Sequence, residues 1–135
     1  MTDPVIPRML PELTLENVHF WTGGRDGALL ILRCGACGRW VHPPVAACPE
    51  CGGELTPEPV SGRGTVFTFT VNHYAYNPAV PLPYVIALVD LVEQDGLRLM
   101  TDIVHCNPDD VSIGMSVRVV FEQHDEIYVP LFEPG

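Results

Sequence analysis

The sequence predicts a mainly β protein with a short helical arm, a small ribbon held by cysteines, and a five-stranded barrel. Two closely spaced cysteine pairs predict the ribbon, and five apolar or alternating segments after residue 64 predict the barrel. A chain of 135 residues buries about two-thirds of its unfolded surface, enough for a small barrel with a metal-stapled appendage. We therefore expect an arm at 1–32, a ribbon at 33–56 and a barrel at 57–135.

The arm starts irregularly, since prolines interrupt residues 1–12. Thr14 is a suitable N-cap for a short helix that Gly23 and Gly24 would end. The apolar side of this helix is too small to form a core alone, so we predict that Phe20 and Trp21 help to dock a partner or a second copy of the chain. We place the adjacent His19 at a surface or interface. The apolar run at 28–32 fits a buried strand or a helical turn equally well.

The ribbon carries the most specific pattern of the chain, C-x2-C-x10-C-x2-C, formed by Cys34, Cys37, Cys48 and Cys51. Each pair can bind one ion from a tight turn, and Gly38 and Gly52 can adopt the positive φ that such turns require. Four thiolates close a tetrahedral site, so the metal is expected to be structural. Zinc is the expected ion, although iron fits the same ligands. We expect His42, between the pairs, to pack or face solvent.

The compartment follows from the N-terminus and the cysteines. Residues 1–12 show no basic start followed by an apolar run, so a secreted protein with two disulfides is the less favoured interpretation. The longest apolar runs, 28–32 and 85–89, are too short to cross a bilayer. We expect a cytoplasmic protein with reduced thiols and no membrane association.

The barrel is predicted from five strands. The first, 65–71, alternates so that Phe67, Phe69 and Val71 share one face. Asp95-Gly96 predicts a hairpin between 84–92 and 97–104, and 115–121 and 127–132 complete the set. Five strands with a turn or helix after the third match an OB-type barrel. The long loop at 72–83 is a candidate enzyme-contacting surface through two side chains, Tyr74 and Tyr76.

The acidic net charge argues against nucleic-acid binding, a function that a ribbon beside an OB barrel would otherwise favour. A ribbon beside an OB barrel occurs in proteins that bind single-stranded nucleic acid, and the aromatic residues above could stack on bases. The chain has 17 acidic and 7 basic residues, and after Gly64 two arginines face ten acidic residues, a formal −8. Nucleic-acid binders neutralise phosphates with clustered basic residues. We therefore expect no nucleic acid, and keep this class as the alternative.

Independent catalysis has two candidate sites. Cys106 stands beside His105, but neighbours in an extended segment point to opposite faces, so adjacency does not make them a nucleophile and its base. The second candidate is the polar cluster of Glu122, His124, Asp125 and Glu126. Residues 123–126 lie between two predicted strands, so we expect them to form a solvated hairpin turn. We expect no catalytic residue in this chain.

Several of these motifs together resemble a known family. They are Phe20-Trp21 in the arm, the CxxCG and CPxCG knuckles, the lead Ser61-Gly62-Arg63-Gly64-Thr65-Val66, and Ile113-Gly114-Met115. In this order they resemble the zinc-ribbon plus OB-fold proteins of domain-of-unknown-function family 35 (DUF35), also called acyl-CoA-associated proteins. The resemblance covers residues 13–132.

The resemblance implies a role beyond the fold. Members of this family are typically non-catalytic subunits beside thiolase-superfamily enzymes or hotdog-fold hydratases that act on CoA thioesters, either cleaving or condensing them. It thus implies an accessory subunit in a hetero-oligomer with a thiolase-like or lipid-transfer-protein-type enzyme, bordering its acyl-CoA channel. Steroid side-chain degradation by an aldolase complex is the favoured pathway. For contact with the CoA phosphates we choose Arg63 first, then Arg25 and Arg98, because guanidinium groups suit phosphate.

Overall fold

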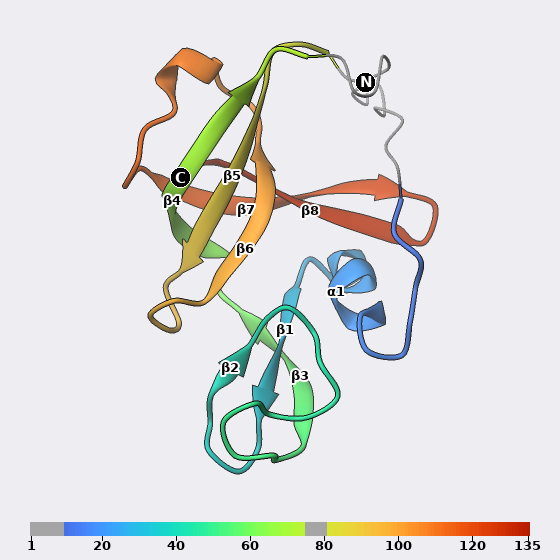
Figure 1. Cartoon of the computed structure of the whole chain (residues 1–135). Helices are drawn as coiled ribbons and strands as arrows, with labels where there is room; N and C mark the ends of the chain where they lie inside the picture. The colour runs from blue at the N-terminus through green and yellow to red at the C-terminus, as the bar shows by residue number, and fades with distance from the viewer. Residues whose placement is uncertain (1–9, 75–80) are drawn as a thin grey trace.

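The arm of the computed structural model, which describes residues 10–74 and 81–135, is a short helix followed by a 3-10 turn (Figure 1). Helix α1 spans Val18–Thr22 and continues directly into η1, Gly23–Asp26. The N-cap of α1 is Asn17 rather than Thr14, because Thr14 and Asn17 exchange backbone-to-side-chain hydrogen bonds in the turn before the helix. None of the helices described has the length and apolar character needed to cross a bilayer.

The ribbon is a three-stranded antiparallel sheet in the order β2-β1-β3. Its strands are β1, Leu29–Cys34, β2, Trp40–Val41, and β3, Leu55–Val60, so the apolar run at 28–32 forms a strand. Pro57 and Pro59 lie within β3, an edge strand, where a residue without an N–H is tolerated. The sheet runs from residue 29 to residue 60, and we retain 1–32, 33–56 and 57–135 as a proposed division.

The barrel closes in the order β4-β5-β6-β8-β7, and the predicted mainly β architecture with its OB barrel is confirmed. The strands are β4, Arg63–Asn72, β5, Tyr84–Leu91, β6, Arg98–Ile103, β7, Ser116–His124, and β8, Ile127–Pro134. The 3-10 helix η2, Pro108–Asp110, follows the third strand as expected. β6 and β8 are parallel and meet at Ile103 and Phe132, which closes the barrel.

A β-bulge in β4 overturns one predicted face. The register with β5 shifts between Val66 and Thr68, so the in-out alternation reverses there. Val66 is buried, whereas Phe67 is 40% exposed, with the Arg98 guanidinium 3.7 Å above its ring. Phe69 packs against the core. The prediction that Phe67 shares the face of Phe69 and Val71 is therefore wrong.

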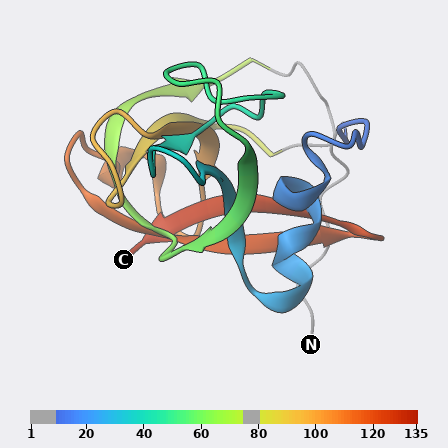
Figure 2. The ribbon, with the colours of Figure 1, turned by 90° about the horizontal axis from the view of Figure 1, so that it is seen from below.

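One apolar core joins the three parts of the chain. It is built mainly from the inward faces of the barrel strands, and it also contains Phe20 from α1, Leu29 and Ile31 from β1, and Trp40 from β2. A second, much smaller cluster lies inside the ribbon and consists of Leu32, Cys34, Val41 and Cys48. The β7–β8 hairpin extends beyond the barrel alongside α1, as Figure 2 shows from below.

Candidate functional site

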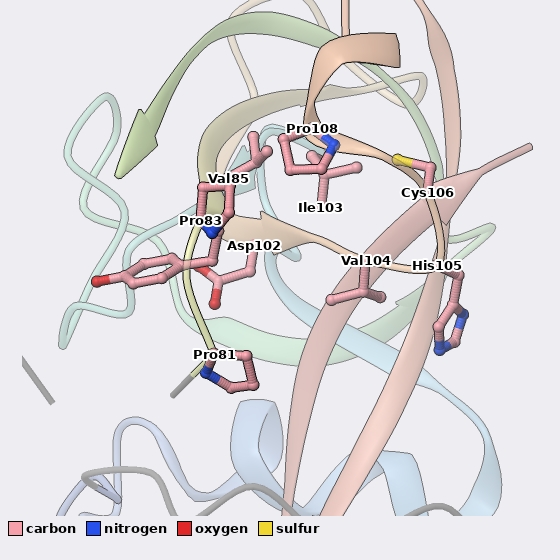
Figure 3. Close-up of a pocket in the computed structure, with 10 residues that line it drawn as sticks. Pro81, Pro83, Val85, Asp102, Ile103, Val104, His105, Cys106 and Pro108 are labelled. Carbon is pink, nitrogen blue, oxygen red and sulfur yellow. The ribbon is translucent and has the colours of Figure 1, made fainter. Parts of the chain in front are cut away.

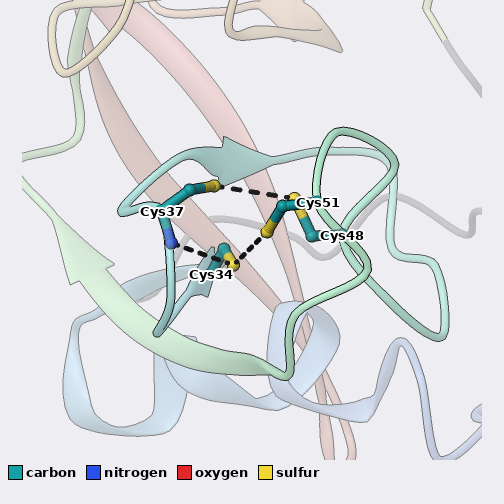
Figure 4. A group of neighbouring side chains, drawn as sticks. All are labelled: Cys34, Cys37, Cys48 and Cys51. Atoms are coloured by element: carbon teal, nitrogen blue, oxygen red, sulfur yellow. Dashed lines mark hydrogen bonds between the residues drawn. The ribbon is translucent and has the colours of Figure 1, made fainter.

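The four ribbon cysteines converge on one point, with Cys34 at the end of β1 and the others in the two loops that follow (Figure 4). All four Sγ atoms lie within 4.8 Å of one another. The separations are 3.5 Å from Cys34 to Cys51 and 3.8 Å from Cys37 to Cys48. An ion with tetrahedral Zn–S bonds of about 2.3 Å sets sulfurs about 3.8 Å apart, so this donor set fits one metal ion.

The backbone of each knuckle explains why the pairs hold this geometry. The amide of Gly38 donates to the carbonyl of Cys34 at 2.9 Å, and the amide of Gly52 donates to that of Cys48 at 2.8 Å. Both glycines have positive φ, 78° and 73°, as the sequence predicts. A residue with a Cβ would strain these two turns, which bring the second thiol of each pair toward the first.

Electrostatics around the sulfurs favour a bound cation. The backbone N–H of Cys37 lowers the pKa of the Cys34 thiol to about 6. The backbone N–H of Cys51 likewise lowers the pKa of Cys48. The amide of Gly53 also lowers the pKa of Cys51, but hydrogen bonds with Cys34 and Cys37 and burial raise it to about 12. Crowding of the four thiols therefore makes the metal-free cluster hold protons, which a metal ion would displace.

Of the two histidines near the ribbon, His19 is buried and His42 is half-buried. His19 is only 9% exposed, and its Nε2 has no hydrogen-bond partner in the part of the chain that the structure describes. The exposed surface predicted as one of two places for His19 is therefore wrong, because α1 turns this side chain toward the ribbon residues Leu32 and Leu55, while its place at an interface stays a prediction. The His42 ring lies 4.9 Å from that of Phe20, and burial, with His19 nearby, lowers its pKa to about 4. His42 packs, as expected.

Cys106 lies at one end of the barrel, beside a pocket of about 200 Å³ between β5, β6 and η2 (Figure 3). Burial, and secondarily Asp110, raise the pKa of the Cys106 thiol, whereas a nucleophilic cysteine needs a lowered pKa. The His105 ring points away from the Cys106 sulfur (Figure 3) and its Nδ1 lies 2.6 Å from Glu133. These contacts differ from those of a nucleophile and its base.

The polar cluster at the end of β7 forms a shorter turn than the sequence suggests. β7 extends to His124, so only Asp125 and Glu126 form the turn. The Nε2 of His124 lies 2.7 Å from Glu122 Oε1, and both side chains are largely buried. The extended hairpin pairing, which reaches His124 and Ile127, explains the difference.

The three arginines predicted to contact CoA lie on different elements. Arg63 begins β4 and stands opposite the exposed Arg118 of β7. Arg98, on β6, pairs with Asp90 at 2.7 Å in addition to its contact with Phe67. Arg25 is exposed on η1. Arg118 is itself paired with Glu133 at 2.7 Å, so Arg63 stays the first choice through its own position at the start of the barrel rather than through a second unpaired arginine.

The residues predicted to contact a partner differ in accessibility. Phe20 is 7% exposed and belongs to the core of this chain, edge-on to Trp21 at 4.8 Å, so Trp21 is the member of the pair with surface to offer. Tyr74 is 67% exposed. Tyr76 lies outside the described residues. A cavity of about 190 Å³ between arm and ribbon adds a further candidate surface, lined in part by the fully exposed Leu15 and by Val45.

Sequence reasoning missed one contact between the modules. The Gln94 side chain, in the β5–β6 turn, accepts a hydrogen bond from the Trp40 amide at 2.9 Å and donates one to the Trp40 carbonyl at 3.0 Å. The neighbouring Glu93 accepts from the amide of Ser61. The sequence marks residues 93–96 only as a hairpin turn, and nothing local signals a contact 54 residues away.

Two family models match the chain. The model "ChsH2, rubredoxin-like zinc ribbon domain" covers residues 21–57, and "ChsH2, C-terminal OB-fold domain" covers residues 57–122. A DUF35 domain-containing scaffold protein of Methanocaldococcus jannaschii is 39% identical over 81% of this chain and 79% of its own length.

Two longer relatives are named as hydratase subunits. A probable enoyl-CoA hydratase alpha subunit of Thermomonospora curvata is 36% identical over 98% of this chain. A 3-oxo-4,17-pregnadiene-20-carboxyl-CoA hydratase alpha subunit of Mycobacterium tuberculosis is 35% identical over 93% of it. This chain spans 41% and 40% of their respective lengths.

Among solved structures, a chain of an "Ltp2-ChsH2(DUF35) aldolase" is similar throughout. It superposes with a TM-score of 0.83 at 35% identity, over 93% of this chain and 98% of that one. A DUF35 protein of unknown function from Sulfolobus solfataricus, at 16% identity and a TM-score of 0.65, shares the fold.

Proposed function

Because the chain belongs to the DUF35 family of ChsH2-type zinc-ribbon and OB-fold proteins, we propose that it is an accessory subunit of a thiolase-superfamily enzyme that acts on acyl-CoA thioesters. The observation that carries this proposal is its similarity, over nearly the whole of both chains, to the DUF35 chain of an Ltp2-ChsH2 aldolase. The partner would supply the reacting residues, and this chain would stabilise the partner's competent fold.

The chemistry of the side chains supports this division of labour. The Cys106 thiol has a raised pKa, and the imidazoles of His105 and His124 each lie beside a carboxylate. A nucleophilic thiol needs a lowered pKa and a base within hydrogen-bond reach, whereas the His105 ring is turned away from the Cys106 sulfur and toward Glu133 (Figure 3). These groups are better suited to holding the barrel together than to attacking a thioester.

We propose that the four cysteines bind zinc. Cys34, Cys37, Cys48 and Cys51 would hold the ion through all four of its coordination positions, which leaves none for water or substrate. The ion would supply structural cross-linking of the two knuckles. The chain's own contribution is to fix the resulting ribbon between the arm and the barrel through Phe20, Trp40 and Gln94.

We propose that the partner contacts Trp21 and Tyr74, and that Arg63, with Arg118 opposite, meets CoA phosphates at the edge of the partner's channel. A guanidinium group can bind phosphate through two parallel hydrogen bonds, and Arg63 stands on the strand next to Arg118, whose own guanidinium is paired with Glu133. The pathway that we propose is steroid side-chain degradation in the cytoplasm, because one relative is named for a pregnadiene carboxyl-CoA, a steroid thioester.

Co-purification tests the proposal. The tagged chain is co-expressed with the thiolase-like protein encoded nearest to it, and the complex is measured by size-exclusion chromatography with light scattering. We expect a stable hetero-oligomer that Trp21→Ala and Tyr74→Ala weaken, whereas Val92→Ala, at another exposed apolar position, leaves it unchanged. Absence of any complex, together with submicromolar binding of a single-stranded oligonucleotide at low salt, would instead support the nucleic-acid alternative.

A further inference from the structure

The β5–β6 turn of the barrel reaches into the ribbon and occupies the free edge of its sheet. β2 is an edge strand, with β1 on its other side. The Gln94 side chain satisfies both the N–H and the C=O of Trp40, the two groups that a neighbouring strand would otherwise take, at 2.9 and 3.0 Å. Because both hydrogen bonds come from one planar amide, they fix the position and the orientation of the Trp40 backbone relative to the β5–β6 turn.

A second contact from the same turn fastens the other side of the ribbon. Glu93 Oε2 accepts from the amide of Ser61 at 2.9 Å, where the chain leaves β3 and enters β4. The turn therefore contacts the ribbon at its edge strand β2 and at its exit. This limits rotation of the ribbon about the single connection at residues 61 and 62.

The segment that Gln94 holds is the segment that closes the first cysteine knuckle. Trp40 follows Cys37 by three residues. The amide of Cys34 donates to the carbonyl of Arg39 at 2.8 Å, and Arg33 Nε donates to that of Gly38 at 3.0 Å. The Arg33 guanidinium also lies 4.8 Å over the Trp40 ring. Residues 38–40 thus have cysteine ligands on one side and Gln94 on the other.

We infer that Gln94 is a positioning residue for the metal site, and that it couples metal binding in the ribbon to docking of the ribbon on the barrel. This inference rests on the proposed metal role of the four cysteines. Both metal binding and docking of the ribbon require residues 38–40 to be ordered. Whichever happens first therefore lowers the free-energy cost of the other. Coupling of this kind is reciprocal: loss of Gln94 weakens metal binding, and loss of metal loosens the β5–β6 turn.

The test compares metal affinity in the whole chain and its variants. Zn²⁺ affinity is measured by competition with a chromophoric chelator, and Co²⁺ absorption reports the tetrahedral thiolate set. We expect Gln94→Ala to weaken affinity by about tenfold. Gln94→Glu keeps an acceptor but loses the donor to the Trp40 carbonyl, so it should also weaken binding. The matched control is Gln123→Ala, at the chain's other glutamine, which is exposed on β7 and should change affinity less than twofold.

Hydrogen exchange supplies the reciprocal readout and a check on folding. The Trp40 amide should exchange faster in Gln94→Ala, which removes its acceptor, and the Ser61 amide faster in the metal-free native chain, while amides of β5 stay protected. Affinities of both Gln94 variants within twofold of the native chain would overturn the coupling and leave the metal proposal standing. A native chain that gives no tetrahedral Co²⁺ spectrum would overturn both.

Discussion

The ribbon and the barrel are held together by different forces. Inside the ribbon, the apolar cluster is small and two of its members are metal-ligand candidates, Cys34 and Cys48. The barrel closes around a continuous apolar core that includes the fully buried Phe132, Val89 and Val66. A cluster as small as the ribbon's contributes little burial free energy, so the ribbon depends on its cysteines and on contact with the barrel.

Metal removal should show the largest difference between the two regions. Structural zinc contributes an apparent ~10–16 kcal/mol in small modules, and a ribbon with so little core should lose its fold without it. We expect Cys48→Ser to abolish hydrogen-exchange protection in β1–β3 and to leave β4–β8 protected. Cys106→Ser, at the fifth cysteine, should change neither region. Equal loss of protection in ribbon and barrel after Cys48→Ser would contradict the comparison.

Truncation in the barrel core should have the next largest effect. Phe132 is fully buried where β6 and β8 meet, so Phe132→Ala should lower the free energy of unfolding by about 3–5 kcal/mol. Phe67→Ala is the matched control, because the bulge leaves Phe67 on the surface in contact with Arg98, and about 1 kcal/mol is expected there. Urea denaturation measures the free energy of unfolding of both variants. Similar decreases in the two variants would contradict the exposed position that the bulge gives Phe67.

Acid should weaken the arm–ribbon contact before it weakens the barrel. Burial lowers the pKa of His42 from 6.5 to about 4, so between these pH values the unfolded chain binds a proton that the folded chain does not. This contribution is complete above pH 6.5 and is lost as pH falls toward 4, by at most about 3 kcal/mol.

The difference between the native chain and His42→Gln isolates this effect from protonation of the cysteines, which both proteins share. Urea denaturation at pH 7, 5.5 and 4.5 should show the native chain losing more stability than the variant. Parallel pH profiles would mean that the His42 ring does not pack against Phe20.

The smallest effect is expected where the arm meets the barrel hairpin. A Cβ on Gly24 would lie 2.5 Å from Tyr128 Cβ and 2.6 Å from a ring carbon of Phe121, so Gly24→Ala should cost about 1–3 kcal/mol. Gly27 has open space around it and a φ of +72°, so Gly27→Ala should cost about 1 kcal/mol through the backbone alone. Thermal denaturation of the two variants compares these losses of stability. A Gly24→Ala variant as stable as the native chain would mean that the arm does not pack on the hairpin.

Short-range patterns predicted most of the fold. The cysteine spacing correctly predicted that the four thiols lie together, and Asp95-Gly96 correctly predicted the β5–β6 hairpin. Both predictions succeed because each pattern consists of a few residues close in sequence. Long-range packing was not predictable. The bulge at Phe67 depends on pairing with β5, the burial of His19 depends on how α1 meets the ribbon, and the Gln94 contact joins residues 54 positions apart. The partner and the CoA contact came from family resemblance rather than from any local pattern.

Turnover by a reconstituted complex tests the proposed accessory role most directly. The thiolase-like partner is assayed against a panel of acyl-CoA thioesters, steroid thioesters included, with and without this chain. We expect turnover to depend on the chain, and Cys106→Ser to support it fully, because the reacting residues would lie in the partner. Full activity of the partner alone, or turnover by this chain alone, would contradict the account.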